Sequence, residues 1–227
     1  MRRLAVLLLA LSLPVAGSQP SYKLRISVSK GASYLYRIRT TMDGGPGGRI
    51  SFELRMRETC QRVNQGATTW RIKIEGVSSS GSGEIAAMKD TLLQMKGMEF
   101  TGVYDSLGQI VSMSVGDAKV GKESLGGTTN LVFSERPVRA GDSWSATQTV
   151  HGKPVRTNYT LQRVETYQRR GAYRIASRFA PGAPVTSTKP GLFLVERSSG
   201  KVFKANGAFL YREGDMSVLA SYTVERL

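Results

Sequence analysis

Apolar and polar residues alternate along most of the chain. The clearest alternation covers residues 49–61, where Ile50, Phe52, Leu54 and Met56 are separated by charged or hydroxyl-bearing residues. Further alternating runs cover residues 21–28, 33–41, 68–75, 98–104, 109–115, 144–150, 155–164, 173–179, 191–197, 201–208 and 215–225. A period of two predicts strands with one face buried and the other in water, as antiparallel sheets have.

A different pattern occupies residues 78–97. Residues 78–83 are all serine or glycine, which predicts a flexible linker. Ile85, Met88, Leu92 and Met95 then follow at helical spacing, and Gly97 stands where a helix commonly ends. We therefore expect one short amphipathic helix at about residues 84–96.

A short turn motif divides the chain into two β units. Residues 137–144 read Pro-Val-Arg-Ala-Gly-Asp-Ser-Trp, and residues 28–34 repeat the pattern Val-x-x-Gly-x-Ser-aromatic. Strand patterns in the same order follow each copy, and only the first half carries the helix. We expect a first β unit at residues 19–116, a connector at 117–136 and a second unit at 137–227. Together they predict a mainly β fold: one strongly curved antiparallel sheet, a half-barrel or open barrel.

Residues 1–18 have the pattern of a secretory signal peptide. Met1-Arg2-Arg3 precede an uncharged apolar run from Leu4 to Leu13, and small residues follow. The run is too short to span a membrane. We expect an exported protein of the periplasm or the extracellular space, not an integral membrane protein after signal removal.

The residue types leave little material for catalysis. With one cysteine and one histidine, the chain cannot assemble an ordinary zinc site. Gly141-Asp142-Ser143 resembles the nucleophile block of the GDS esterases, but that block belongs to an α/β fold and needs a catalytic histidine much later in the chain. The single histidine of this chain, His151, comes only eight positions after Ser143. We interpret Asp142 as ordering a turn and Trp144 as a core anchor. The sequence predicts no catalytic residue, no metal and no cofactor, and we expect Cys60 to be a buried apolar residue.

The Pro-x-x-x-Gly-Asp-x-Trp sequence at 137–144, the signal pattern and the strand-rich halves resemble a group of uncharacterised secreted bacterial proteins. The strand and helix pattern is also similar to the half-barrel of the lipoprotein carrier LolA and its relatives, although no LolA motif matches residue by residue. The LolA resemblance implies that acyl chains bind to the concave face of the sheet, beneath helices.

The first functional hypothesis is therefore a non-enzymatic binding protein for a lipid or another amphiphile. Its candidate ligand-binding residues lie on the apolar sides of strands or on the helix. They are Tyr34, Tyr36, Phe52, Leu54, Trp70, Ile72, Met88, Leu92, Met95 and Trp144.

The alternative is an envelope interaction module that binds an acidic polymer. The net charge is +15, and six basic residues fall on the polar sides of three successive strands. They are Arg37, Arg39, Arg55, Arg57, Arg71 and Lys73. Such a face would attract polyanions, although a solvated charged surface is the simpler interpretation. Nucleic acid is not an expected partner, because the compartment is wrong and this face has no aromatic platform. A hydrolase is the function with the least support.

Overall fold

The computed structural model describes residues 19–116, 118–120, 131–150, 153–183, 185–214 and 216–227, and the predicted signal peptide lies outside them. In these residues twelve strands form one antiparallel sheet. The first half of the chain supplies β1 (Ser33–Asp43), β2 (Arg49–Asn64), β3 (Ala67–Ser82), β4 (Glu99–Asp105), β5 (Ile110–Val115) and β6 (Ala118–Val120). The second half supplies β7 (Ser143–Val150), β8 (Lys153–Tyr167), β9 (Arg170–Phe179), β10 (Val185–Glu196), β11 (Val202–Glu213) and β12 (Met216–Arg226).

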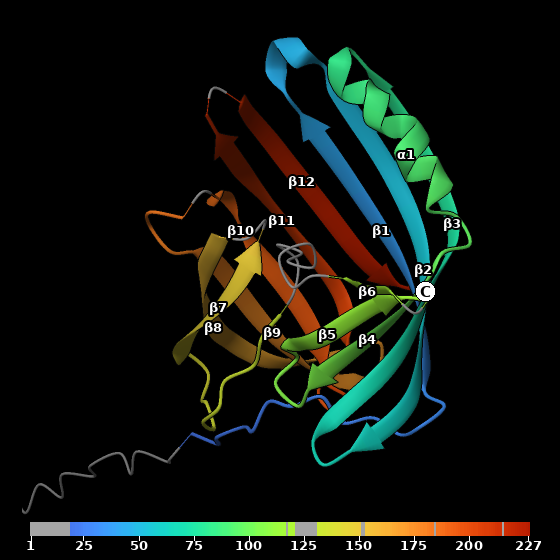
Figure 1. Ribbon diagram of the computed structural model, residues 1–227. Helices are drawn as coiled ribbons and strands as arrows, with labels where there is room; N and C mark the ends of the chain where they lie inside the picture. The colour runs from blue at the N-terminus through green and yellow to red at the C-terminus, as the bar shows by residue number, and fades with distance from the viewer. Residues whose placement is uncertain (1–18, 117, 121–130, 151–152, 184, 215) are drawn as a thin grey trace, which may run out of the picture.

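The strand order β6-β5-β4-β3-β2-β1-β12-β11-β10-β9-β8-β7 shows two meanders of six strands, joined by pairing of β1 with β12. The sheet is open and strongly curved (Figure 1). The predicted fold class is confirmed. We call the end that carries the β1–β2 and β11–β12 turns the upper end, and the opposite end the lower end.

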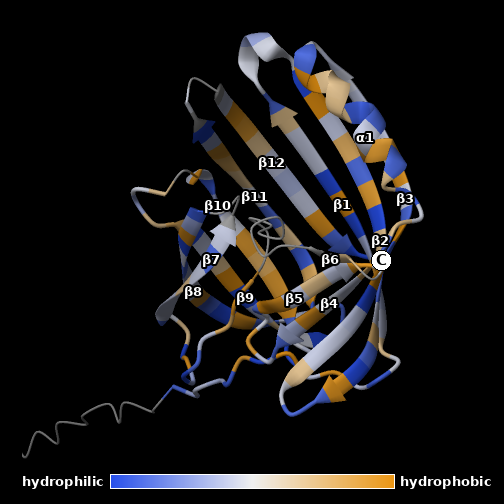
Figure 2. Ribbon diagram, in the orientation of Figure 1, coloured by the Kyte–Doolittle hydropathy of each residue, from blue (hydrophilic) through white to orange (hydrophobic). Residues whose placement is uncertain are grey.

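The register defines an inner, concave face of the sheet. Residues that pair directly across two strands point to the same face. Ile38 pairs with Leu54 and with Val224, and Val224 pairs with Ala205. Figure 2 shows the alternation of apolar and polar positions along these strands.

The largest core cluster packs on the inner face of the second meander. Its buried residues are Leu24, Val132, Phe133, Val138, Tyr159, Leu161, Tyr173, Ile175, Phe193, Val195, Ala205 and Tyr222. Two segments outside the sheet contribute to it, the N-terminal residues and residues 131–138. The protein therefore fills much of this half of the inner face with its own side chains.

The N-terminal segment crosses the lower end instead of forming the strand predicted at residues 21–28. Only Tyr22 forms a bridge, with Val138. The amide of Ile26 donates to the carbonyl of Ser106 in the β4–β5 turn, and the amide of Ser27 donates to that of Ser199 in the β10–β11 turn. The alternation does report burial, because Leu24 is completely buried in the core cluster, but the backbone of this segment bonds to two turns and does not pair along a strand.

The predicted linker at residues 78–83 is wrong, because residues 78–82 continue β3. Ser78 to Ser82 pair with Glu53 to Arg49 of β2. Pairing uses backbone groups, so a long neighbouring strand can hold a Ser/Gly sequence in the sheet. β6 likewise occupies residues 118–120 of the predicted connector.

The predicted helix is present but shorter. A 3-10 turn covers Glu84–Ala87 and the α-helix α1 covers Met88–Gln94. This segment packs against β2 and β3 at the upper end, where a Cβ on Gly81 would lie 3.3 Å from that of Ala86. Gly81 pairs with Ile50, which is completely buried, so the segment covers that corner of the inner face.

Both copies of the turn motif make the same hydrogen bonds. The amide of Gly31 donates to the carbonyl of Cys60, and the amide of Cys60 donates to that of Ala32. In the second copy, the Gly141 amide donates to Leu161, and the Leu161 amide donates to Asp142. Gly31 and Gly141 have φ values of 86° and 95°, a conformation that favours glycine. Each motif thus turns the chain into the first strand of a meander.

Candidate ligand-binding cavity

A cavity of about 150 Å³ lies on the inner face, between the two meanders. β1 to β4 and β10 to β12, or the turns at their ends, supply most of its lining, and Ile26 and Leu131 from the two inserted segments complete it. The lining is Ile26, Tyr36, Ile38, Met56, Glu58, Trp70, Tyr104, Leu131, Phe193, Lys201, Val202, Ala205 and Val224. Eleven of these thirteen residues are aromatic or aliphatic, so the cavity favours an apolar group.

The inner face continues from the cavity toward the upper end in rows set by the register. The first row contains Ile38, Leu54 and Val224, all half-buried. The next row contains Phe52, Thr40 and Tyr222, and the row above it contains Met42, Ile50 and Ala220. A cavity of this volume holds a ring or a short alkyl segment, and a longer chain would extend along these rows.

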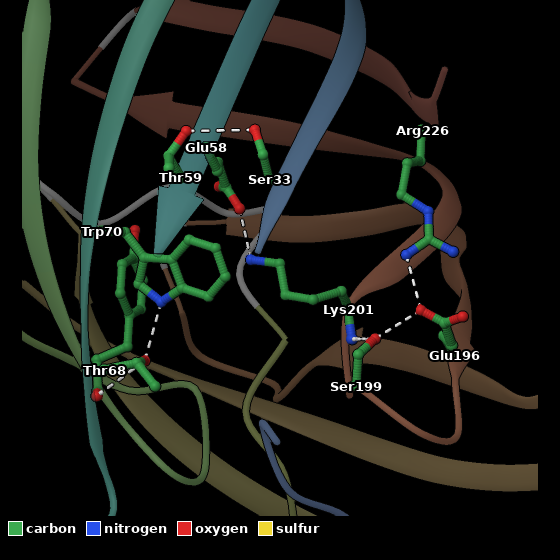
Figure 3. A network of polar contacts seen from close by, with 10 residues as sticks. Ser33, Glu58, Thr59, Thr68, Trp70, Glu196, Ser199, Lys201 and Arg226 are labelled. Atoms are coloured by element: carbon green, nitrogen blue, oxygen red, sulfur yellow. Dashed lines mark hydrogen bonds and ion pairs between the residues drawn. The ribbon is translucent and has the colours of Figure 1, made fainter. Parts of the chain in front are cut away.

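An ion pair between Glu58 and Lys201 lies at the wall of the cavity (Figure 3). Lys201 extends from the β10–β11 turn across the inner face to β2, and its Nζ lies 4.2 Å from the centre of the Trp70 ring. The two charged side chains are only 14% and 13% exposed. Burial of both charges is tolerated because each neutralises the other and Trp70 adds a cation–π contact.

A second buried ion pair lies next to the first, between Glu196 and Arg226. Arg226 Nη1 is 2.9 Å from Glu196 Oε2, and Ser199 Oγ donates to the same carboxylate at 2.7 Å. The Arg226 guanidinium also lies 4.0 Å from the centre of the Phe203 ring. Burial by itself raises the pKa of Glu196, but the hydrogen bonds from Ser199 and Arg226 outweigh burial and hold the pKa below its usual range.

Tyr36 presents an unpartnered hydroxyl group among the residues that line the cavity. The residue is 4% exposed, and within the described part of the chain its Oη has no hydrogen-bond partner. Burial and the nearby Glu58 carboxylate raise the pKa of Tyr36 well above its usual value, so it is a neutral hydroxyl at physiological pH. The Trp70 indole, by contrast, donates to Thr68 Oγ1 at 2.9 Å.

The structure brings some of the predicted ligand-binding residues together and separates others. Tyr36 and Trp70 line the cavity, Tyr34 and Ile72 lie on the same face at its lower side, and Leu54 and Phe52 lie in the rows above. Leu92 is buried under the helix and Met95 is half-buried, whereas Met88 is 43% exposed. Trp144 lies apart from the cavity: its indole donates to the Val132 carbonyl at 2.8 Å and its ring stacks on Tyr159.

The six basic residues of the alternative hypothesis lie on the outer face, as their alternation predicts. Most of them face carboxylates. Glu53 lies within 4 Å of Arg37, Arg39 and Arg55, Arg57 pairs with Glu75 at 2.5 Å, and Lys73 pairs with Glu99 at 3.2 Å. This pattern is that of a solvated sheet face with cross-strand charge pairs.

The sequence interpretation missed the charged residues of the inner face. Glu58 was not among the predicted site residues, although it has the same parity as Phe52, Leu54 and Met56. A carboxylate on the apolar parity of a strand is the signal that indicates a buried charge. Its partner, Lys201, is 143 residues away in a turn and could not be found from spacing.

The other chemistry considered from the sequence has structural explanations. Ser143 Oγ is 2.8 Å from Thr160 Oγ1, and Asp142 Oδ2 accepts from the Arg139 amide at 2.7 Å, as a turn-ordering residue does. His151 lies outside the described residues. Cys60 is 1% exposed. Among the residues described, no cluster of histidine, cysteine and carboxylate side chains could hold a metal ion, and no helix is long and apolar enough to cross a membrane.

The fold and the cavity place the chain among proteins built on one large curved antiparallel sheet with an apolar inner face. No protein-family model matches the sequence, and neither does the sequence of any curated protein. The structure is similar to that of lipovitellin, solved to describe its lipid–protein interactions, with a TM-score of 0.55 and 11% identity over 88% of this chain. The chain spans 25% of the length of lipovitellin, and the likeness shows a shared fold.

Two bacterial structures overlap less well. One is a Vibrio parahaemolyticus domain described as an outer membrane lipoprotein-sorting protein, with a TM-score of 0.31 and 6% identity over 86% of this chain and 83% of that one. The other is a LolA superfamily protein from Nitrosomonas europaea, with a TM-score of 0.24 and 9% identity over 89% of each chain.

Proposed function

We propose that the protein is a non-enzymatic binding protein that holds the apolar chain of a lipid or another amphiphile on the inner face of its sheet. The observation that carries the proposal is the cavity around Tyr36, Trp70 and Val224, which continues into the half-buried apolar row of Ile38, Leu54 and Val224. The structural similarity to lipovitellin, a protein whose structure was solved to describe lipid–protein interactions, supports the choice of ligand class. The predicted signal peptide supports export to the periplasm or the extracellular space.

The geometry favours a chain lying along the sheet over a compact ligand. The cavity is smaller than the roughly 300–1,000 Å³ of ordinary ligand pockets, so it can enclose only part of a lipid. The rows at Ile38 and Phe52 continue it, and the segment of Glu84–Gln94 covers their far corner. The remainder of the lipid would stay at the protein surface, as a carrier that exchanges its cargo requires.

Filling the cavity tests the proposal. Ala205 lines the cavity, whereas Ala208 lies on the outer face of the same strand, where it pairs with Ser221. We expect Ala205→Phe to weaken binding of the uncharged fluorescent probe N-phenyl-1-naphthylamine by about tenfold or more, because the ring occupies space that the probe needs. Ala205→Leu should weaken it less, and Ala208→Phe should leave it unchanged.

Circular dichroism and thermal melts identify variants that fail to fold, and Ala205→Leu keeps the test usable if the larger ring is not tolerated. Equal affinity of the wild type, Ala205→Leu and Ala208→Phe would contradict the proposal. A complementary measurement is mass spectrometry of small molecules that co-purify with protein from its native envelope. Recovery of acyl-chain compounds, depleted in Ala205→Leu, is the expected result.

A further inference from the structure

The inner face contains a hydrogen-bonding group that the folded protein leaves unused. Tyr36 is 4% exposed, lines the cavity, and is one of two described residues with a buried polar side-chain atom that lacks a partner. The other such atom is Nε of Arg37, which lies on the outer face among the charge pairs. Buried hydroxyl groups nearly always find a partner, because leaving one without a hydrogen bond is costly. The Tyr36 hydroxyl can therefore form a hydrogen bond with a polar group of a bound ligand.

The electrostatic surroundings of this hydroxyl are close to neutral. Glu58 and Lys201 are the charged residues that line the cavity in the described structure, and they pair with each other. Arg226, the register neighbour of Tyr36, pairs with Glu196. A ligand carboxylate would face the Glu58 carboxylate, and a ligand ammonium would face the Lys201 ammonium. A charged ligand group of either sign would also lose its hydration, and the charged side chains near the cavity are already paired with one another.

The donors at the cavity determine which uncharged group fits. The Tyr36 hydroxyl can donate, and the Lys201 ammonium, 5.9 Å from the centre of the Tyr36 ring, has three N–H donors of which one serves Glu58. The acceptor on the wall, Glu58, is already engaged. A ligand carbonyl oxygen can accept a hydrogen bond from the Tyr36 hydroxyl and requires no acceptor from the cavity wall.

We propose that Tyr36 recognises the uncharged carbonyl group of an acyl ester or amide, so that the protein selects neutral acylated ligands over free fatty acids. The inference rests on the proposed function, because it assigns the head group of a chain bound on the same face. The chain lies along the rows of Ile38 and Phe52, and its carbonyl oxygen accepts a hydrogen bond from Tyr36 Oη. Selectivity follows from the paired state of Glu58 and Lys201, which offers no net charge to a carboxylate.

Displacement of N-phenyl-1-naphthylamine from the full-length protein by decane, methyl decanoate and decanoate at pH 8 tests this inference. We expect methyl decanoate to bind about tenfold more tightly than decane, the gain of one buried hydrogen bond, and decanoate to bind more weakly than the ester. Tyr36→Phe should reduce the affinity for methyl decanoate to that for decane and leave decane unaffected. Tyr173→Phe is the matched control, because Tyr173 is a buried tyrosine of the core cluster that neither lines the cavity nor belongs to the rows above it.

The outcomes separate this inference from the proposed function. If none of the three compounds displaces the probe, the proposed function fails. If decane binds but the ester binds no better, or if decanoate binds as tightly as the ester, only the role of Tyr36 is overturned. A loss of decane binding in Tyr36→Phe would likewise overturn it, because that loss would show a packing role. The melting temperature of unliganded Tyr36→Phe should not fall, since the variant removes a hydroxyl group that has no partner.

Discussion

Removal of Lys201 should destabilise the fold far more than removal of a surface lysine. The Glu58 and Lys201 side chains are 13% and 14% exposed, so solvent screens their interaction weakly. Lys201→Met leaves the Glu58 carboxylate buried without a counter-ion, which costs about 3–5 kcal/mol. The variant also loses the cation–π contact with Trp70, which contributes about 0.5–2 kcal/mol. For a domain with a stability of about 5–15 kcal/mol, the expected loss is a large fraction of the total.

A double-mutant cycle isolates the pair. Glu58→Met with Lys201→Met replaces both charges by apolar chains, and we expect it to be at least about 2 kcal/mol more stable than Lys201→Met alone. Lys204→Met is the control, because Lys204 pairs with Glu225 on the outer face with 49% and 41% exposure, where a pair contributes under about 1 kcal/mol. Urea denaturation followed by circular dichroism gives the free energies of unfolding. Equal losses for Lys201→Met and Lys204→Met, or additive losses in the double variant, would refute this reasoning.

Three further predictions concern other parts of the fold. Gly200→Ala should lower the urea midpoint strongly, because Gly200 has φ 69° and an added Cβ would lie 2.2 Å from the Arg25 carbonyl oxygen. Gly214→Ala is the comparison, because Gly214 has φ 57° but open space around an added Cβ. Equal shifts of the midpoint in the two variants would contradict the close approach at Gly200. Cys60 should react slowly with iodoacetamide in the native protein and rapidly in urea, because burial raises the pKa of its thiol; rapid native labelling would contradict the packing. The wild type should have a higher free energy of unfolding than Glu196→Gln near neutral pH, and the difference should shrink as the pH falls below the usual carboxyl range. The reason is that the pKa of Glu196 is lowered in the folded state. A difference that persists unchanged at low pH would exclude this linkage.

The strand-level architecture could be predicted because alternation reports burial directly. Phe52, Leu54 and Met56 share one face in the sequence pattern and in the register. The turn at Asp142 was predicted as well, and the positive φ values of Gly31 and Gly141 favour glycine at both copies of the motif. The internal repeat of the two β units stays a prediction, although Gly31 and Gly141 make equivalent hydrogen bonds.

The errors arose where a neighbouring segment decides the local structure. Residues 78–82 have the composition of a linker, but the edge of β2 provides hydrogen bonds for their backbone. Residues 21–28 alternate like a strand, but the β4–β5 and β10–β11 turns are the partners that their backbone finds. Local sequence does not contain these partners, so local pattern could not identify them.

The sequence by itself determined most of the strands, their apolar sides and the small number of residues suited to catalysis or metal binding, because side-chain type and a period of two are local properties. Only the tertiary structure decided which strands are neighbours, that β12 pairs with β1, and that Lys201 crosses the inner face to Glu58. It also left Tyr36 buried without a partner beside an apolar cavity. These features depend on the curvature of the whole sheet, which brings residues far apart in the chain to one side of a shared concave surface.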